Sequence, residues 1–324
     1  MMLSADEAAA TGRFQPLRTA AFERFAAGDH AGALPFASAA LERFPQKGEV
    51  PFWLACIHCR LGEPEAAVAA LRQGLGRGHY WPRDWLLEDD DLEQLRGRAD
   101  FAAVVQESAR AEAAAPSPEP PGPALLSAPS AADEPRAPRA VVLALHGWGQ
   151  DADEFALHWS AAAAAGFTVA VARSSQEPCP GFFVWDDRAR ALRDVDVQLA
   201  GVLRRAPGAP LVLAGFSQGG GIAVDVGLAG RPAPAAAVLA LAAGLDDLEG
   251  PPAADRLAAA AAAGLRVRLL VGDQDDALDD VRGLADVVAG AGLDGGLALL
   301  PGLGHEVPGP PGEVLAAELG RLLG

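Results

Sequence analysis

The stretch from Pro210 to Gly219 reads Pro-Leu-Val-Leu-Ala-Gly-Phe-Ser-Gln-Gly, and it decides the fold of the C-terminal part of the chain. Its first five residues form a short apolar run, as a buried parallel strand requires. Two further glycines and a helical pattern through residue 228 follow. A Gly-x-Ser-x-Gly motif between a strand and a helix predicts a sharp turn that exposes the hydroxyl of Ser217. Both glycines of the motif are needed because a Cβ atom there would collide with the neighbouring strand and helix.

Apolar runs alternate with helical patterns on both sides of this motif, from residue 139 to residue 324. Such alternation is typical of a parallel sheet with crossover helices. We therefore expect the α/β class, with a doubly wound, mostly parallel sheet of the α/β-hydrolase type.

A serine hydroxyl is a weak nucleophile unless a base takes its proton. His305 follows the apolar run at residues 297–300, and a loop beyond the last strand is where this kind of fold supplies its base. We therefore predict that His305 is the base. His158 falls inside a predicted helix, where we expect a packing or solvent-facing role.

A carboxylate is expected between Ser217 and His305 in chain order, after a strand. The apolar run at residues 265–271 predicts that strand, and it ends in Gly-Asp-Gln-Asp-Asp at residues 272–276. One of the three carboxylates would hold the imidazole in the right tautomer. Position alone does not choose among them.

Two backbone N–H groups are needed to bind the negatively charged oxygen that forms during acyl transfer. The amide of Gln218, directly after the nucleophile, is the first expected donor. The second should come from the loop after the first strand, where residues 146–150 read His-Gly-Trp-Gly-Gln. Glycines on both sides of Trp148 allow this loop to turn sharply.

The N-terminal part of the chain reads as helical and contains a repeat. Small and apolar residues recur at an offset of 34 positions, for example Ala21 with Ala55, Gly28 with Gly62 and Leu41 with Leu75. The period and the small residues resemble tetratricopeptide (TPR) repeats, which stack antiparallel helices. A third, degenerate unit is expected between residues 85 and 111, with an apolar stripe that caps the stack. This stripe comprises Leu92, Leu95, Phe101 and Val104.

Composition changes divide the chain into four segments. We predict an N-terminal tail at residues 1–13, a TPR-like helical domain at 14–113, and a hydrolase domain at 139–324. Residues 114–138 are rich in Pro, Ala and Ser and lack periodicity, which predicts a semi-rigid linker without a core.

The formal net charge of −17 argues against nucleic acid and anionic membranes as partners. The first residues lack the pattern of a secretory signal, and no apolar run is long enough to span a bilayer. Three cysteines fit a reducing compartment, so we expect a cytoplasmic protein. Cys56 and Cys59 form a Cys-x-x-Cys, but no second Cys pair lies nearby, so we expect small core residues rather than metal ligands.

The motifs at residues 146–150, 183–186, 215–219, 272–275 and 304–305 together resemble the phospholipase/carboxylesterase family of α/β-hydrolases. The resemblance implies a sheet with little or no lid, and no metal or organic cofactor. It also implies roles for four residues: Asp275 as the acid, the amide of Trp148 as the second oxyanion donor, and Trp185 and His146 at the substrate. The chain departs from the family after Asp275, where Asp276-Ala277-Leu278 stands in place of the usual proline-containing segment. Asp273 and Asp276 therefore stay open as alternatives.

These expectations define a serine hydrolase that cleaves a small-molecule ester or an acylated substrate through an acyl-enzyme on Ser217. An acyl-thioesterase is one alternative, and a catalytically silent interaction protein is another. In either case the TPR-like region is expected to bind a protein partner or to mediate self-association. The sequence leaves open the natural substrate, the length of its acyl chain and the oligomeric state.

Overall fold

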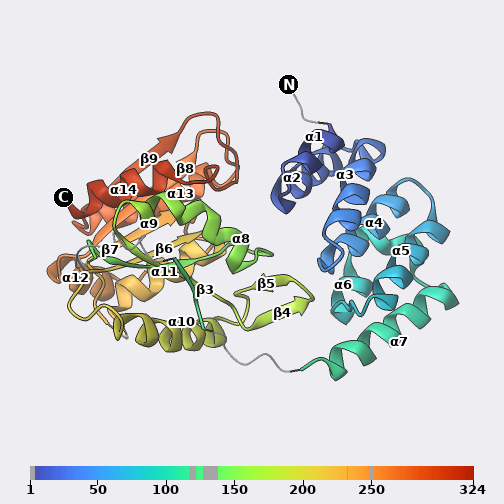
Figure 1. Ribbon diagram of the computed structural model, residues 1–324, viewed down its shortest axis with the longest axis horizontal. Coiled ribbons are helices and arrows are strands. Elements are labelled where there is room, and N and C mark those ends of the chain that lie inside the picture. Colours follow the sequence, from blue (N-terminus) through green and yellow to red (C-terminus); the bar gives the residue numbers. More distant parts are fainter. Residues whose placement is uncertain (1–3, 117–121, 127–137, 232, 249–251) are drawn as a thin grey trace. The chain divides into compact units, whose positions relative to one another are not determined.

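The computed structural model describes residues 4–324 except 117–121, 127–137, 232 and 249–251 (Figure 1). Contacts divide the chain into two compact units, which we describe separately. One unit comprises Met1–Ser117 together with Glu177–Phe182, and the other comprises Pro118–Gln176 and Phe183–Gly324. The domain bounds drawn from composition stay predictions.

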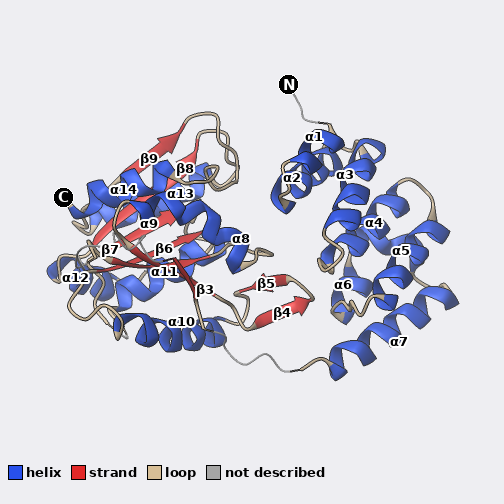
Figure 2. Cartoon of the chain, in the orientation of Figure 1, coloured by secondary structure: helices blue, strands red, loops and turns tan. Residues whose placement is uncertain are grey.

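The first unit is almost entirely helical (Figure 2). The second and third helices form one antiparallel pair and the fourth and fifth form another, as the repeat predicts. Gly28 and Gly62 end the first helix of each pair, both at φ +76°, a conformation that favours glycine. The elements are α1 (Ala5–Ala10), α2 (Phe14–Ala26), α3 (His30–Arg43), α4 (Glu49–Arg60), α5 (Pro64–Gly76), α6 (Arg83–Glu88), η1 (Asp90–Leu95) and α7 (Ala99–Ala114).

Small residues at equivalent positions of the two pairs let the helices approach closely. Ala21 and Ala33 of the first pair and Ala55 and Ala67 of the second are all buried. Close approach of helix backbones increases dispersion contacts between the larger side chains around them. The short helix α1 lies within the predicted N-terminal tail and packs against the first pair.

The predicted apolar stripe of the third unit is also buried. Its four residues, Leu92, Leu95, Phe101 and Val104, are at most 2% exposed. Trp81 is buried as well. Its backbone N–H donates to the Ser108 hydroxyl at 2.7 Å, and that hydroxyl donates to the Trp81 carbonyl at 2.9 Å. One buried hydroxyl thus satisfies two backbone groups where α6 and α7 meet.

Residues 177–182 come from the C-terminal half of the sequence but pack with the helical unit. They include all but the first residue of β4 (Gln176–Cys179) and the first residue of β5 (Phe182–Val184), two strands that pair with each other. The N–H of Gly48 donates to the Pro180 carbonyl at 2.7 Å, and the rings of Trp85 and Phe182 lie 5.3 Å apart, edge to face. Nothing in the repeat pattern indicated this grouping.

The second unit is built on a seven-stranded sheet in the order β1-β3-β2-β6-β7-β8-β9. Six neighbouring strands run parallel, and β1 pairs with β3 antiparallel at the edge. The strands are β1 (Ala124–Leu126), β2 (Val141–Leu145), β3 (Thr168–Ala172), β6 (Leu211–Phe216), β7 (Ala237–Leu241), β8 (Arg266–Gly272) and β9 (Leu297–Leu300). The expected α/β fold is confirmed. Strand β1 lies within the segment predicted as a linker, where it extends the sheet at its edge.

Helices cover both faces of this sheet. Alternate residues of β2 therefore pack into two different buried clusters, one on each face. Val141, Leu143 and Leu145 belong to one buried cluster, whereas Val142 and Ala144 belong to another. The first cluster includes α10 (Arg188–Leu203), α11 (Gln218–Ala229), α12 (Ala254–Ala262) and α13 (Leu278–Gly290). The second includes α8 (Ala152–Ala156), η2 (Leu157–Trp159), α9 (Ser160–Ala164) and α14 (Glu313–Leu323). None of the helices in the described part of the chain combines the length and apolar character that crossing a bilayer requires.

Replacing Ser108 by Ala should destabilise the helical unit, because a buried backbone N–H and a buried carbonyl both lose their partner. We expect the free energy of unfolding to fall by about 1–3 kcal/mol, measured by urea denaturation followed by circular dichroism. Ser38→Ala, the same change at an exposed position of α3, is the control and should be nearly neutral. Equal midpoints for the two variants would contradict this reading of Ser108.

Candidate active site

Ser217 occupies a strained turn between β6 and α11. Its backbone angles are φ 52° and ψ −126°, a region that residues with a Cβ rarely adopt. Such a conformation costs about 1–3 kcal/mol and persists only when surrounding contacts enforce it. The N–H of Ser217 donates to the Leu241 carbonyl of β7 at 2.8 Å, which fixes the turn to the sheet. The turn therefore presents the hydroxyl beyond the carboxyl end of β6.

The two glycines of the motif have the steric role that the sequence predicts. A Cβ at Gly215 would lie 2.3 Å from the carbonyl oxygen of Gly219, and a Cβ at Gly219 would lie 2.2 Å from that of His146. Contacts this short are not found between real Cβ atoms and backbone. The elbow can close only where both positions lack a side chain.

A chain of hydrogen bonds connects three residues that are far apart in the sequence. His305 Nε2 lies 3.0 Å from the Ser217 hydroxyl, although 88 positions separate the two residues. The other ring nitrogen, Nδ1, lies 3.0 Å from Asp275 Oδ1. Both distances are within the range over which a proton is shared or transferred between heavy atoms.

Of the three carboxylates that follow β8, Asp275 reaches Nδ1 of His305. The Asp275 side chain is fully buried, and its Oδ1 also accepts the N–H of Ala277 at 2.9 Å. Asp273 points elsewhere, because its carboxylate accepts the N–H of Gly302 at 2.7 Å. Asp276 is exposed, with an oxygen within 4.8 Å of the donor atoms of Asp275 and His305. These three groups could in principle hold a cation, but both nitrogens of His305 already have partners in a proton relay.

The imidazole of His305 is supported on one side and open on the other. Its ring lies 5.1 Å from that of Phe216, and its side chain is 39% exposed. Asp247, in the loop after β7, is a further acidic neighbour that the sequence did not single out. Burial raises the pKa of the Asp247 carboxyl, whereas the hydrogen bond from the Gly244 N–H and the charge of His305 act in the opposite direction.

Gln218 opens α11 directly after the nucleophile. The first amides of a helix lack carbonyl partners within the helix, so its N–H can face an anion. Its side chain has a second task, because Oε1 accepts the N–H of Trp185 at 2.8 Å and Nε2 donates to Asp186 Oδ1 at 2.7 Å. The sequence did not predict these hydrogen bonds to residues 185–186, because a glutamine in a sequence does not indicate which groups its side chain will contact.

The loop that carries Trp148 is held on both sides of that residue. The N–H of Gly147 donates to Gln150 Oε1 at 2.8 Å, and the N–H of Gly149 donates to the Phe183 carbonyl at 2.8 Å. Gly149 has φ +70°, which explains why glycine stands there. The indole of Trp148 is 43% exposed.

Trp185 and His146, which the resemblance assigns to the substrate, pack against each other. Both side chains are buried, at 2% and 0% exposure, and their rings lie 4.9 Å apart. The indole N–H of Trp185 donates to the His146 carbonyl at 2.9 Å. These contacts connect the loop after β2 to the segment after β5, and a role for either residue at the substrate stays a prediction.

Comparisons with known proteins agree with this architecture. Residues 136–280 match the family model "Serine aminopeptidase, S33", and residues 24–80 match "Tetratricopeptide repeat". The C-terminal part of the chain thus has a fold of the α/β-hydrolase type, and the N-terminal part contains a segment similar to TPR repeats. The narrower resemblance to the phospholipase/carboxylesterase family stays a prediction. No curated protein matches the sequence.

Two solved structures have a similar fold. The first is an uncharacterized protein from Bacillus cereus, with 18% identity and a TM-score of 0.51, over 94% of this chain and 98% of the other. The second is esterase PE8, with 21% identity and a TM-score of 0.50, over 62% of this chain and 98% of the other. At such low identity these similarities support the fold alone.

Replacing Gly219 by Ala should push α11 away from the loop after β2, because the added Cβ meets the His146 carbonyl. We expect a loss of about 1–3 kcal/mol in the free energy of unfolding and, if the site is catalytic, a roughly 100-fold loss of turnover from displacement of the elbow. Gly290→Ala in α13 is the matched control, since nothing lies within 4 Å of the Cβ it would add. It should be neutral or stabilising by up to about 1 kcal/mol. A Gly219→Ala variant as stable and active as the control would refute this account of the elbow.

Proposed function

We propose that the chain is a serine hydrolase that cleaves carboxylic esters through an acyl-enzyme on Ser217. The observation that carries the proposal is the hydrogen-bonded series Ser217, His305 and Asp275, with 3.0 Å at each step. A relay of nucleophile, base and orienting carboxylate is the arrangement that acyl transfer needs.

In the proposed mechanism the Ser217 oxygen attacks the ester carbonyl carbon while His305 Nε2 takes the hydroxyl proton. The buried Asp275 stabilises the imidazolium that forms, and the amides of Trp148 and Gln218 bind the carbonyl oxygen as it becomes negative. Collapse of this intermediate expels the alcohol, which receives the proton from His305. A water molecule then attacks the acyl-enzyme by the same route and releases the acid.

The surroundings of Ser217 support a small, uncharged ester as the substrate. Trp148 is the exposed aromatic side chain of the oxyanion loop, so we assign it, rather than Trp185, to contact with the acyl group. Asp186 and Asp247 place negative charge near Gln218 and His305. Like charges repel, so anionic esters are expected to bind more weakly than neutral ones.

For the helical unit we propose protein binding or self-association, supported by its match to TPR repeats. Sedimentation equilibrium of the full-length chain distinguishes the two roles. A monomer at every concentration would exclude self-association.

Turnover of p-nitrophenyl acetate and butyrate tests the catalytic proposal. Ser217→Ala should lower kcat by roughly 10⁵–10⁶-fold, and Asp275→Asn by roughly 10⁴-fold because the imidazole loses its orienting partner. Asp273→Asn and Asp276→Asn are matched controls, since neither carboxylate is hydrogen-bonded to His305. They should keep rates close to those of the unaltered chain.

Equal turnover with and without Ser217 would end the proposal. No turnover of any ester by the unaltered chain would instead favour a silent interaction protein. Oxygen and sulfur esters of the same acyl group, compared side by side, decide between esterase and thioesterase.

A further inference from the structure

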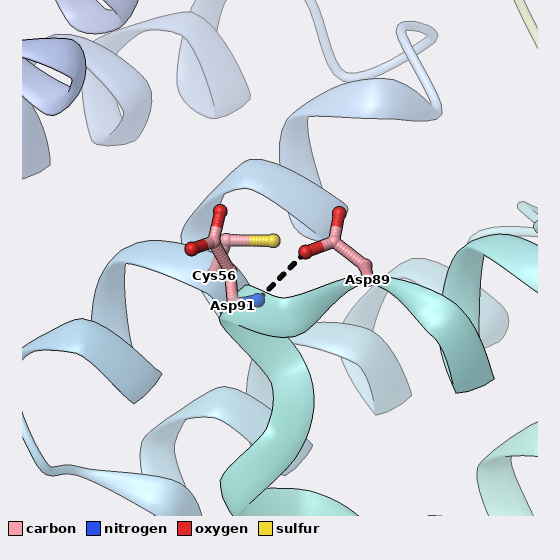
Figure 3. A group of neighbouring side chains, drawn as sticks. All are labelled: Cys56, Asp89 and Asp91. Carbon is pink, nitrogen blue, oxygen red and sulfur yellow. Dashed lines mark hydrogen bonds between the residues drawn. The ribbon is translucent and has the colours of Figure 1, made fainter.

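A second cluster of reactive side chains lies in the helical unit, at the Cys-x-x-Cys of α4. Cys56 lies there with Asp89 and Asp91, from the segment that begins η1 (Figure 3). One donor atom from each of these three residues lies within 4.8 Å of the other two. Donor atoms this close can share a single metal ion, because metal–sulfur and metal–oxygen bonds are about 2.0–2.3 Å long.

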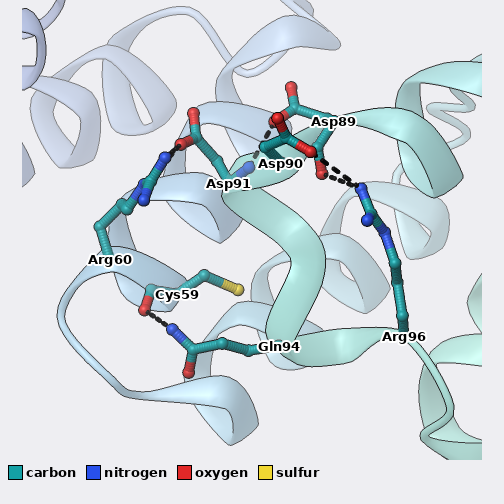
Figure 4. Close-up of polar contacts among 7 residues, drawn as sticks. All are labelled: Cys59, Arg60, Asp89, Asp90, Asp91, Gln94 and Arg96. Carbon is teal, nitrogen blue, oxygen red and sulfur yellow. Dashed lines mark hydrogen bonds and ion pairs between the residues drawn. The ribbon is translucent and has the colours of Figure 1, made fainter.

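The surrounding contacts hold this cluster in place. Arg60 Nε donates to Asp91 Oδ1 at 2.5 Å, and the side chain of Gln94 donates to the Cys59 carbonyl (Figure 4). Asp89 Oδ1 accepts the N–H of Asp91 at 2.8 Å. Each carboxylate uses Oδ1 in these contacts, so Oδ2 of each stays available as a metal ligand. The ends of α4 and η1 are thereby fixed before any ion binds.

Packing in an ordinary apolar core does not explain the surroundings of the Cys56 thiol. Cys56 is only 6% exposed, and its thiol forms no disulfide. Figure 3 shows this sulfur pointing toward the Asp89 carboxylate. Two carboxylates lie beside this buried thiol. Negative charge next to a buried group of low polarity costs free energy, so apolar packing alone does not account for the arrangement. A cation would offset that cost.

We propose that Cys56, Asp89 and Asp91 bind one divalent cation of the zinc type. Sulfur donors select zinc or a similar borderline metal over Mg²⁺ and Ca²⁺, which prefer oxygen ligands alone. Three protein ligands with water at the fourth position are a coordination that zinc adopts in proteins.

The binding reaction balances in charge and protons. The Cys56 thiol releases one proton to solvent when it binds the metal, while the two carboxylates bind in the ionised form. The excess negative charge of the three ligands is reduced by Arg60, which pairs with Asp91. The bound ion would connect α4 to η1, so its role is to stabilise the helical unit rather than to take part in acyl transfer.

The test uses the full-length chain, treated with a chelator and titrated with Co²⁺. We expect one Co²⁺ per chain with a thiolate-to-cobalt charge-transfer band, which Zn²⁺ then abolishes on displacing it. Zn²⁺ should also raise the melting temperature of the helical unit. Cys56→Ser and Asp89→Asn should each weaken binding by at least roughly 100-fold.

Two variants control for general effects. Asp90→Asn alters an acidic neighbour whose side chain is 91% exposed, and Cys179→Ser removes a buried thiol outside the cluster. Both should bind Co²⁺ as the unaltered chain does, and circular dichroism shows whether each variant is folded. The proposal would be overturned if the unaltered chain gave no charge-transfer band, or if Asp89→Asn and Asp90→Asn bound Co²⁺ with equal affinity. Neither outcome depends on whether Cys56→Ser folds.

Discussion

The close approach of three backbone segments at Gly215, Ser217 and Gly219 is the constraint on which the hydrolase unit depends. With no Cβ at either glycine, β6 can turn directly into α11 while the loop after β2 packs against the turn. That packing holds Ser217 at a positive φ and directs its hydroxyl beyond the sheet. The same contact sets the distance between α11 and the loop that carries Trp148, so the nucleophile and both proposed oxyanion donors are placed by a single steric feature.

The parallel sheet supplies the rest of the site from the same edge. The carboxyl ends of β6, β8 and β9 meet there, which brings Ser217, Asp275 and His305 together although they lie on separate connections. Burial of Asp275 matters because a charge in a poorly polarisable environment acts more strongly on the imidazole than one in water. The helical unit follows a different rule, in which small residues at matched positions permit close helix packing.

Much of this could be predicted from the sequence, because the signals were local. The strand at 210–214, the glycines of the elbow and the 34-residue repeat each specify their own conformation. Other features depend on packing that no local pattern encodes: the edge strand β1 within a Pro-rich segment, the grouping of residues 177–182 with the helices, and the burial of Trp185 and His146. The choice of Asp275 from three carboxylates rested on resemblance, since only the path of the loop determines which side chain turns inward. For Cys56, sequence reasoning found the thiol but not the two carboxylates that the fold brings to it.

The central claim is that the hydroxyl of Ser217 is activated by the imidazole of His305. Reaction with a fluorophosphonate, followed by peptide mass spectrometry, tests this directly, because such reagents phosphonylate activated serines and leave ordinary ones intact. The account predicts one adduct per chain, on Ser217, and no adduct in a His305→Ala variant that remains folded. Labelling spread over several serines, or labelling of Ser217 that persists at the same rate without His305, would contradict it.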